Sequence, residues 1–270
     1  MTAAITDRLA LSEDQLLVVA QRLGVNGLPT VLDVRPRHTT VDRRDAAFDV
    51  ATRDLVARNL ILDGTVDLEL ADLLHVLERP DRELAMRLVT PDGPARVSLV
   101  RRNRLCVLAR RVGYDITLRV LGHDVDVREA TSALVSELPQ APQADIQPIG
   151  APLDAMSEAL GNSHDPSVIA DRVRALGAET RAAMLLGSAL GTRQAFAEIV
   201  YNALVEDSDR IYKAPAAVAV LYTKRGRIVG APSSSPSGQL WTTLKAGSDH
   251  AVNQAISQLI ELSTERWGVS

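Results

Sequence analysis

The chain has few of the residues on which several common kinds of function depend. Its single cysteine, Cys106, rules out an intrachain disulfide and a cysteine zinc cage. Only 3% of the residues are aromatic, so the core must be built from aliphatic side chains and alanine. No run approaches the ~20 apolar residues of a membrane span, and the N-terminus lacks the apolar stretch of a signal peptide. We therefore expect a cytoplasmic protein that does not insert into membranes, with Cys106 buried in its core.

An excess of basic charge is also absent, which argues against a nucleic-acid partner. The net charge is −4, and 46% of the residues are hydrophobic, enough for a real core. The basic spots are residues 101–104 and 110–111, and few aromatics lie near them for stacking on bases. We predict that these arginines protect strand edges against pairing with other chains, with RNA binding as the less favoured alternative.

What the chain does contain is one structural plan used twice. Residues 84–138 and 195–262 each read as several strands joined by short turns and followed by one amphipathic helix. Such short connections favour antiparallel pairing. We predict an α/β fold of the α+β type, a pseudo-twofold repeat with a central, mainly antiparallel sheet and helical bundles at both ends. Its halves are residues 1–139 and 140–270, which together form one domain.

Local signals place the individual elements. Ser12 and Gln15 form a capping-box pattern and Gly24 can end the helix that they begin. The predicted helices are 13–23, 42–59, 67–78, 126–138, 153–160, 165–176, 178–190 and one beginning at Ser248. The predicted strands are 30–34, 83–89, 96–101, 105–112, 115–121, 195–204, 216–223, 227–231 and 239–245. Residues 139–152, with four prolines, read as an extended linker.

Catalytic and metal-binding patterns are weak. The five histidines are dispersed, and none forms a pair that would place two ligands on one helix face. His123, Asp124 and Asp126 are the nearest approach to a hard-metal or enzyme site, although aspartates at a strand-to-helix junction more often serve as turn formers and caps. Residues 187–191 resemble a glycine-rich loop, but close helix packing is the better reading. We predict no cofactor and no metal.

Apolar helix residues point instead to an interaction surface. The middle helical segment contains more apolar residues than a thin helix pair needs, namely Met156, Met184, Leu185, Leu186 and Leu190. Core packing accounts for most such residues individually. An adaptable face that contains methionine is nevertheless suited to contact another protein.

At this point the sequence resembles a known family. The segments LSEDQLLVV (residues 11–19), RLG (22–24) and LPTVLDV (28–34) resemble the N-terminus of the EspG family, and the order of elements agrees over nearly the whole chain. EspG proteins are cytosolic chaperones of mycobacterial type VII (ESX) secretion. The resemblance implies binding of PE–PPE heterodimers through the apolar tip of the PPE helical bundle, which keeps the cargo soluble and brings it to the secretion machinery.

The resemblance also implies which regions hold the cargo. In the family a loop between early meander strands and a C-terminal helical bundle make the contact. Carried onto this chain, the loop residues are Pro91, Asp92, Gly93, Pro94 and Arg96. The bundle residues are Met184, Leu186, Leu190, Gln254, Gln258 and Glu261.

Two alternatives to the chaperone stay open. One is an enzyme with a site near His123, Asp124 and Asp126, and the other is a regulatory adaptor that uses the same scaffold for different proteins. A homodimer in the absence of cargo is a further expectation. The sequence does not distinguish between ESX systems or between PPE partners.

Overall fold

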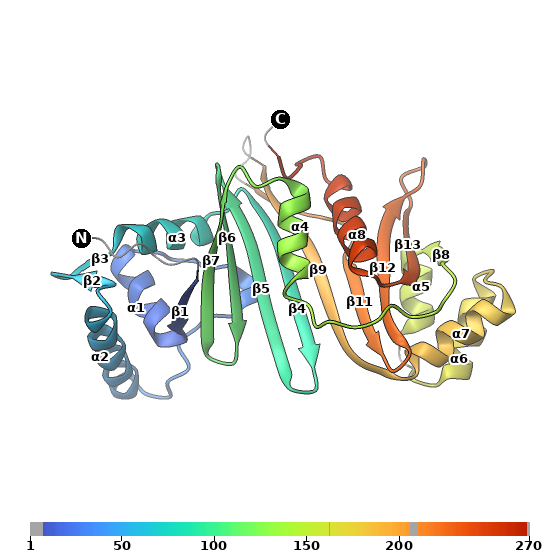
Figure 1. Ribbon diagram of the computed structural model, residues 1–270, viewed down its shortest axis with the longest axis horizontal. Coiled ribbons are helices and arrows are strands. Elements are labelled where there is room, and N and C mark those ends of the chain that lie inside the picture. Colours follow the sequence, from blue (N-terminus) through green and yellow to red (C-terminus); the bar gives the residue numbers. More distant parts are fainter. Residues whose placement is uncertain (1–7, 162, 206–209, 269–270) are drawn as a thin grey trace. The chain divides into compact units, whose positions relative to one another are not determined.

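The computed structural model describes residues 8–161, 163–205 and 210–268, and it divides into two compact units (Figure 1). Unit 1 comprises Met1–Ala85 and Ala95–Val125, and unit 2 comprises Met86–Pro94 and Asp126–Ser270. Both combine helices with antiparallel strands, as predicted for the fold class. The predicted halves divide after residue 139. The compact units divide differently because the helix after Asp126 packs within unit 2.

Unit 1 begins with helices whose ends the sequence signals correctly. They are α1 (Glu13–Leu23), α2 (Val41–Ala57) and α3 (Leu68–Glu78). Ser12 and Gln15 form the predicted capping box, and Gly24 ends α1 in the left-handed conformation with φ of 68°. None of the helices in the described ranges is long and apolar enough to cross a membrane.

The strands of unit 1 pair in the order β1-β7-β6-β5, and these neighbours run antiparallel. They are β1 (Leu9–Ser12), β5 (Gly93–Arg102), β6 (Leu105–Val112) and β7 (Asp115–His123), with a separate hairpin of β2 (Ile61–Leu62) and β3 (Thr65–Val66). Strand β4 (Arg82–Thr90) begins in unit 1 and continues in unit 2. Cys106 is buried on β6 as predicted, and burial raises the pKa of its thiol to about 12.

The predicted strand at residues 30–34 is wrong. Residues Thr30–Leu32 form a short 3-10 helix, η1, after which Asp33 takes a left-handed conformation with φ of 51°. Arg96 donates to the carbonyl of Val31 at 3.1 Å, and Arg111 donates to the carbonyl of Leu32 at 2.6 Å. Side-chain donors therefore satisfy the backbone acceptors that a neighbouring strand would otherwise satisfy.

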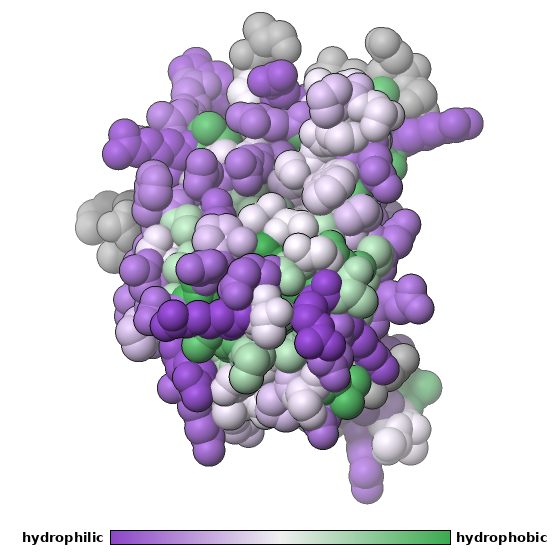
Figure 2. Space-filling model, turned by 90° about the vertical axis from the view of Figure 1, so that its right-hand side faces the viewer, coloured by the Kyte–Doolittle hydropathy of each residue, from purple (hydrophilic) through white to green (hydrophobic). Residues whose placement is uncertain are grey.

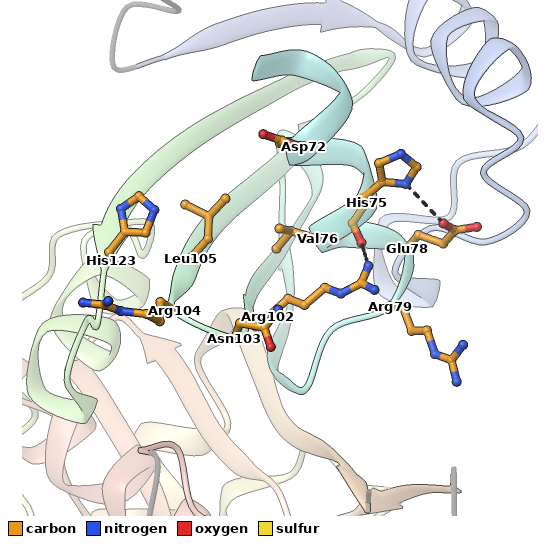
Figure 3. Close-up of a pocket in the computed structure, with 10 residues that line it drawn as sticks. All are labelled: Asp72, His75, Val76, Glu78, Arg79, Arg102, Asn103, Arg104, Leu105 and His123. Carbon is orange, nitrogen blue, oxygen red and sulfur yellow. Dashed lines mark hydrogen bonds and ion pairs between the residues drawn. The ribbon is translucent and has the colours of Figure 1, made fainter. Parts of the chain in front are cut away.

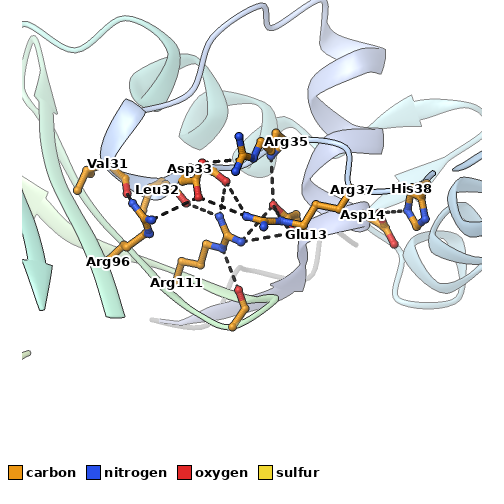
Figure 4. Close-up of polar contacts among 11 residues, drawn as sticks. Glu13, Asp14, Val31, Leu32, Asp33, Arg35, Arg37, His38, Arg96 and Arg111 are labelled. Atoms are coloured by element: carbon orange, nitrogen blue, oxygen red, sulfur yellow. Dashed lines mark hydrogen bonds and ion pairs between the residues drawn. The ribbon is translucent and has the colours of Figure 1, made fainter. Parts of the chain in front are cut away.

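A buried ion network lies beneath this segment (Figure 4). The side chains of Glu13 and Arg111 face each other at 3.4 Å, and both residues are at most 6% exposed. Arg37 adds a second ion pair to Glu13 at 3.1 Å. The predicted role in protecting strand edges is wrong for Arg111, because β6 lies between β5 and β7 and the arginine neutralises a buried carboxylate instead.

The strands of unit 2 pair antiparallel in the order β9-β11-β12-β13-β8, and β10 pairs with β9. The strands are β8 (Ile149–Pro152), β9 (Arg193–Val205), β10 (Arg210–Lys213), β11 (Val218–Thr223), β12 (Gly226–Ser234) and β13 (Leu240–Ala246). The sequence reading missed β8 and β10. The predicted linker is therefore partly wrong, since its last four residues pair with β13.

The rest of this linker is tied to the start of β12. Arg227 donates its backbone N–H to the carbonyl of Pro142 at 2.7 Å, and Ala144 donates to the carbonyl of Arg227 at 3.0 Å. A Cβ on Gly226 would meet the backbone of Gln143 and Ala144 at 2.7 Å, so only glycine permits this close approach. The linker is thus held against the sheet by backbone hydrogen bonds.

Helices cover the unit 2 sheet on two faces. They are α4 (Val127–Val135), α5 (Leu153–Leu160), α6 (Pro166–Ala175), α7 (Thr180–Leu190) and α8 (Asp249–Glu261). The core beneath α5, α6 and α7 includes Leu221 and Ile228, whereas the neighbouring residues Val220 and Val229 are buried outside that cluster. Successive strand residues point to opposite faces, so α8, which packs on β12 and against α4, covers the other face (Figure 1).

Candidate protein-binding site

The two helices α6 and α7 are held by strong N-terminal caps. The carboxylate of Asp165 accepts hydrogen bonds from Ser167 and Val168, and these bonds lower the pKa of that carboxyl. Glu179 caps α7 in the same way, with its pKa lowered by the backbone N–H groups of Arg181 and Ala182. Each cap satisfies donors that would otherwise lack a partner, so both helix starts are fixed.

Glycines let the two helices approach closely. A Cβ on Gly187 would lie 3.0 Å from the Cβ of Ala170 and closer still to the carbonyl oxygen of Pro166. A Cβ on Gly191 would lie 2.5 Å from the ring of Pro166. The structure therefore confirms that residues 187–191 serve close helix packing.

A surface groove follows the line between the two helices. Its cavity measures about 380 Å³. The residues that line it are Pro166, Ser167, Ala170, Asp171 and Arg174 from α6, with Thr180, Ala183, Met184 and Ser188 from α7. Met184 is 63% exposed. Figure 2 looks onto this end of unit 2 and shows hydrophobic side chains gathered between hydrophilic ones.

The chemistry of the groove suits an apolar protein surface. Its middle is alanine, proline and methionine, while Asp171 and Arg174 form an ion pair of 3.1 Å on the rim. An apolar centre with a polar rim is the usual build of a protein interface, and a flexible methionine adapts to its partner. The groove lining, however, has neither a histidine nor a cysteine.

Comparison with known proteins identifies the family. The model of the EspG family matches residues 12–258. The chain belongs to the EspG family. It is 27% identical to the ESX-1 secretion-associated protein EspG1 of Mycobacterium tuberculosis, over 92% of this chain and 85% of that protein. It is 25% identical to the ESX-3 secretion-associated protein EspG3 of Mycolicibacterium smegmatis, with the same two coverages.

A solved structure shares the fold. The type VII secretion system chaperone EspG5 of M. tuberculosis, determined in complex with a PE25–PPE41 dimer, superposes with a TM-score of 0.79. The alignment covers 97% of this chain and 98% of EspG5 at 18% sequence identity. At 18% identity this structural similarity establishes the fold alone.

The three site residues predicted on α7 differ in accessibility. Met184 is exposed in the groove, whereas Leu186 and Leu190 are buried in the core beneath α5, α6 and α7. As contacts of a partner these leucines remain a prediction, but in this structure their side chains already pack inside unit 2. Sequence reasoning did not single out the groove residues of α6, because Ala170 and Arg174 carry no distinctive signal of their own.

The predicted residues on α8 do not join the groove. Gln254 and Glu261 are exposed, Gln258 is half-buried, and Lys245 donates to the side-chain oxygen of Gln254 at 3.1 Å. Helix α8 lies on the sheet face opposite to α5, α6 and α7. The sequence grouped these residues with Met184, and the structure places them on a separate surface of unit 2.

The predicted loop is the tight turn between β4 and β5. Pro91 and Asp92 form the turn and are exposed, and so is Pro94. Thr90 donates its hydroxyl to the carbonyl of Gly93 at 3.0 Å, and Gly93 has φ of 121°, a conformation that other residues rarely adopt. This short turn is accessible to a partner.

Arg96, the last of the predicted loop residues, has a structural partner. Its guanidinium donates to the carbonyl of Val31 and pairs with Asp33 at 3.3 Å (Figure 4). Although burial opposes the shift, the neighbouring arginines, first Arg35 and then Arg96, lower the pKa of the Asp33 carboxyl. The role of Arg96 in binding remains a prediction, and its visible role is to hold residues 30–33.

The enzyme alternative rests on carboxylates that have structural roles. Arg104 donates to Asp124 at 2.8 Å, and this hydrogen bond lowers the pKa of the Asp124 carboxyl. Asp126 caps α4 in a capping box with Glu129. Within the described ranges no group of three histidine, cysteine, aspartate or glutamate residues could hold a metal. The reading of these aspartates as turn former and cap is confirmed.

Proposed function

We propose that this EspG-family protein is a cytosolic chaperone that binds a PE–PPE heterodimer and delivers it to an ESX secretion system. Membership of the family supports the secretion role, and the fold shared with EspG5 in its PE25–PPE41 complex supports the class of cargo. The groove between α6 and α7 is the observation that carries the proposal for this chain. It offers an apolar tip a surface with an exposed methionine.

Binding would work by removing apolar surface from water. Met184 and the alanines of the groove would cover apolar side chains at the tip of the PPE protein, at roughly 25 cal/mol for each Å² removed from solvent. The pair of Asp171 and Arg174 would set the orientation of the tip. The exposed turn at Pro91 and Asp92 would supply a second contact. Shielded in this way, the cargo would stay soluble.

The proposed activity is binding without catalysis. The carboxylates that most resembled an enzyme site cap a helix or pair with an arginine, and the groove holds no histidine or cysteine. Release of the cargo would then follow from competition by the secretion machinery. Without cargo, the uncovered groove would favour pairing of two copies.

Co-expression with PE–PPE pairs from the same genome tests the proposal. We expect at least one pair to elute with this protein as a soluble complex in size-exclusion chromatography. The charge introduced by Met184→Glu should abolish that complex, because it would be buried unpaired against an apolar tip. The matched control is Val50→Glu, which places the same charge at a residue of α2 that is 57% exposed.

The outcomes separate clearly. A complex that survives Val50→Glu and is lost with Met184→Glu supports the groove as the binding site. Failure to form a soluble complex with any pair from the genome would contradict the chaperone assignment. Co-purification of unrelated proteins through the same groove would favour the regulatory adaptor.

A further inference from the structure

A second depression lies in unit 1, between α3 and the turn that joins β5 to β6 (Figure 3). Its volume is about 790 Å³. The lining residues are Asp72, His75, Val76, Glu78, Arg79, Arg102, Asn103, Arg104, Leu105 and His123. They include the basic turn that the sequence singled out, and the proposed cargo site uses none of them.

The strand register builds one wall of this depression. Arg102 pairs with Leu105 across β5 and β6, and Leu105 pairs with His123 across β6 and β7. Directly paired residues project from the same face, so an arginine, a leucine and a histidine stand in one row. With strands ~4.8 Å apart, the two outer residues of the row are separated by roughly 10 Å at the backbone.

Helix α3 forms the opposite wall. Asp72 and Val76 are four residues apart and therefore share one helix face. Val76 is buried, and Leu105 is half-buried opposite to it (Figure 3). The depression thus has an apolar floor between two charged walls, one formed by α3 and the other by the strands.

Several charges in the depression are already engaged. Glu78 accepts a hydrogen bond from the backbone of Asn26 and lies 3.6 Å from the ring of His75. Arg104 pairs with Asp124 outside the depression. These contacts fix the positions of Glu78 and Arg104 at the edges of the depression.

Other donors are available. The guanidinium of Arg102 donates to the carbonyl of His75 at 2.7 Å, which occupies one of its five N–H groups. In the described part of the chain the ring of His123 makes no hydrogen bond, although Asp124 is its neighbour in sequence. Arg102 at one end of the row and His123 at the other can therefore each donate to a carboxylate, and Leu105 offers an apolar contact between these two residues.

We propose that this depression binds an acidic peptide segment of a partner protein, with glutamate or aspartate side chains at Arg102 and His123 and an apolar side chain over Leu105 and Val76. Arginine is suited to carboxylates because its planar fork can donate two parallel hydrogen bonds. Asp72 would accept N–H groups of the same segment. The proposal concerns a surface of unit 1 and does not depend on the cargo groove.

A peptide fits this lining better than a phosphate does. A phosphate dianion would meet the carboxylates of Asp72 and Glu78 on the α3 wall and would gain nothing from the apolar floor. A peptide segment carries single charges that are spread apart, N–H donors for Asp72, and an apolar side chain. The mixture of cations, carboxylates and aliphatic surface therefore favours the peptide.

Nuclear magnetic resonance of the full chain labelled with nitrogen-15 tests this proposal. The probe is an octapeptide, acetyl-Gly-Glu-Leu-Glu-Glu-Leu-Glu-Gly-amide, and its comparison peptide has glutamine in place of each glutamate. Inorganic phosphate is titrated separately. We expect the acidic peptide to shift the resonances of residues 102–105 and 123 and to bind at least ~5-fold more tightly than the glutamine peptide, because its hydrogen bonds are charge-assisted.

Two variants and one control localise the binding. His123→Gln removes a ring that makes no hydrogen bond in the described structure, so folding should not depend on it. Arg102→Gln removes the guanidinium. If the Arg102→Gln protein unfolds, the result for His123→Gln decides the question. The control is Arg225→Gln, at an exposed turn position in unit 2. We expect both variants at the depression to weaken peptide binding at least ~5-fold and the control to leave it unchanged.

The contrary results are equally defined. Equal binding of the two peptides, shifts confined to other residues, or no shifts at all would overturn the proposal. Phosphate binding as tight as that of the acidic peptide would replace it with a general anion site.

Discussion

Each unit attaches an irregular segment to its sheet through one buried arginine, but the two arginines are neutralised differently. Arg111 of unit 1 holds the segment around Leu32 and faces Glu13, which is itself buried. Arg227 of unit 2 donates to the carbonyl of Gly247 and pairs with Asp249, whose side chain is 54% exposed. Water can reach the acidic partner in unit 2 and is kept from it in unit 1.

This difference indicates what stabilises each unit. A buried carboxylate and a buried guanidinium each depend on the other, since neither can recover hydration if its partner is lost. Unit 2 depends less on charge and more on close backbone packing at glycines such as Gly187. That packing holds together α6 and α7, whose residues line the groove, so the stability of unit 2 and its proposed binding are connected.

The largest expected effect is in unit 1. Replacing Glu13 by alanine leaves the buried Arg111 guanidinium with its carbonyl acceptors but without the carboxylate that faces it, and we expect a loss of about 3 kcal/mol in the free energy of unfolding. Denaturant unfolding measures this loss. The control is Asp45→Ala, which removes an exposed pair with Arg44 and should cost less than about 0.5 kcal/mol. Similar losses for both variants would contradict the role given to the buried pair.

Close packing in unit 2 is probed by Gly187→Ala. The added Cβ would collide with the backbone of Pro166, and we expect a net cost of about 1–2 kcal/mol after the higher helix propensity of alanine is included. The matched change Gly27→Ala meets open space and should not destabilise the protein. Thermal unfolding compares the two variants. A Gly187→Ala protein as stable as the parent would show that α6 and α7 can separate without cost.

Loss of the acidic partner of Arg227 should lower the free energy of unfolding less than loss of the acidic partner of Arg111. In Asp249→Asn the amide can still accept a hydrogen bond, and water reaches this half-exposed position, so we expect a loss of about 1 kcal/mol. The comparison with Glu13→Ala under identical denaturant conditions is direct. A larger loss for Asp249→Asn would reverse the contrast between the two units.

The smallest effect is a dependence on pH at the groove. Hydrogen bonds lower the pKa of Asp165 in the folded state, so its stabilising contribution is present above the unfolded pKa, near 4, and is lost as the pH falls through the folded value. Asp165→Asn keeps a good N-cap but does not titrate. Unfolding measured between pH 6 and pH 2 should therefore decline less steeply for this variant, and parallel curves would contradict the assigned cap.

The sequence predicts elements best where their signals are local. The cap at Ser12 and the ending at Gly24 are encoded within one turn of the helix, and both were predicted. Strand β8 was missed because Ile149 pairs with Leu244, far along the chain, from a segment rich in proline. Residues 30–34 contain strand-forming side chains, but distant arginines fix a different conformation.

In the candidate site, too, local features could be predicted from the sequence and features set by distant contacts could not. Met184 and Leu186 are two residues apart on one helix, so they point ~200° apart and cannot share a surface. This difference in exposure between the two residues could have been predicted from the sequence. The position of Gln254 could not, because the sheet face that a helix covers depends on the connections of the whole unit. The groove lies between two helices whose close approach depends on the absence of a side chain at Gly187.

Hydrogen exchange measured by mass spectrometry, with and without a bound PE–PPE heterodimer, tests the central claim most directly. We predict slower exchange in residues 166–190 and around the turn at 90–94 when the cargo is bound, with little change in α2. Unchanged exchange in residues 166–190 of a stable complex would contradict the assignment of the groove.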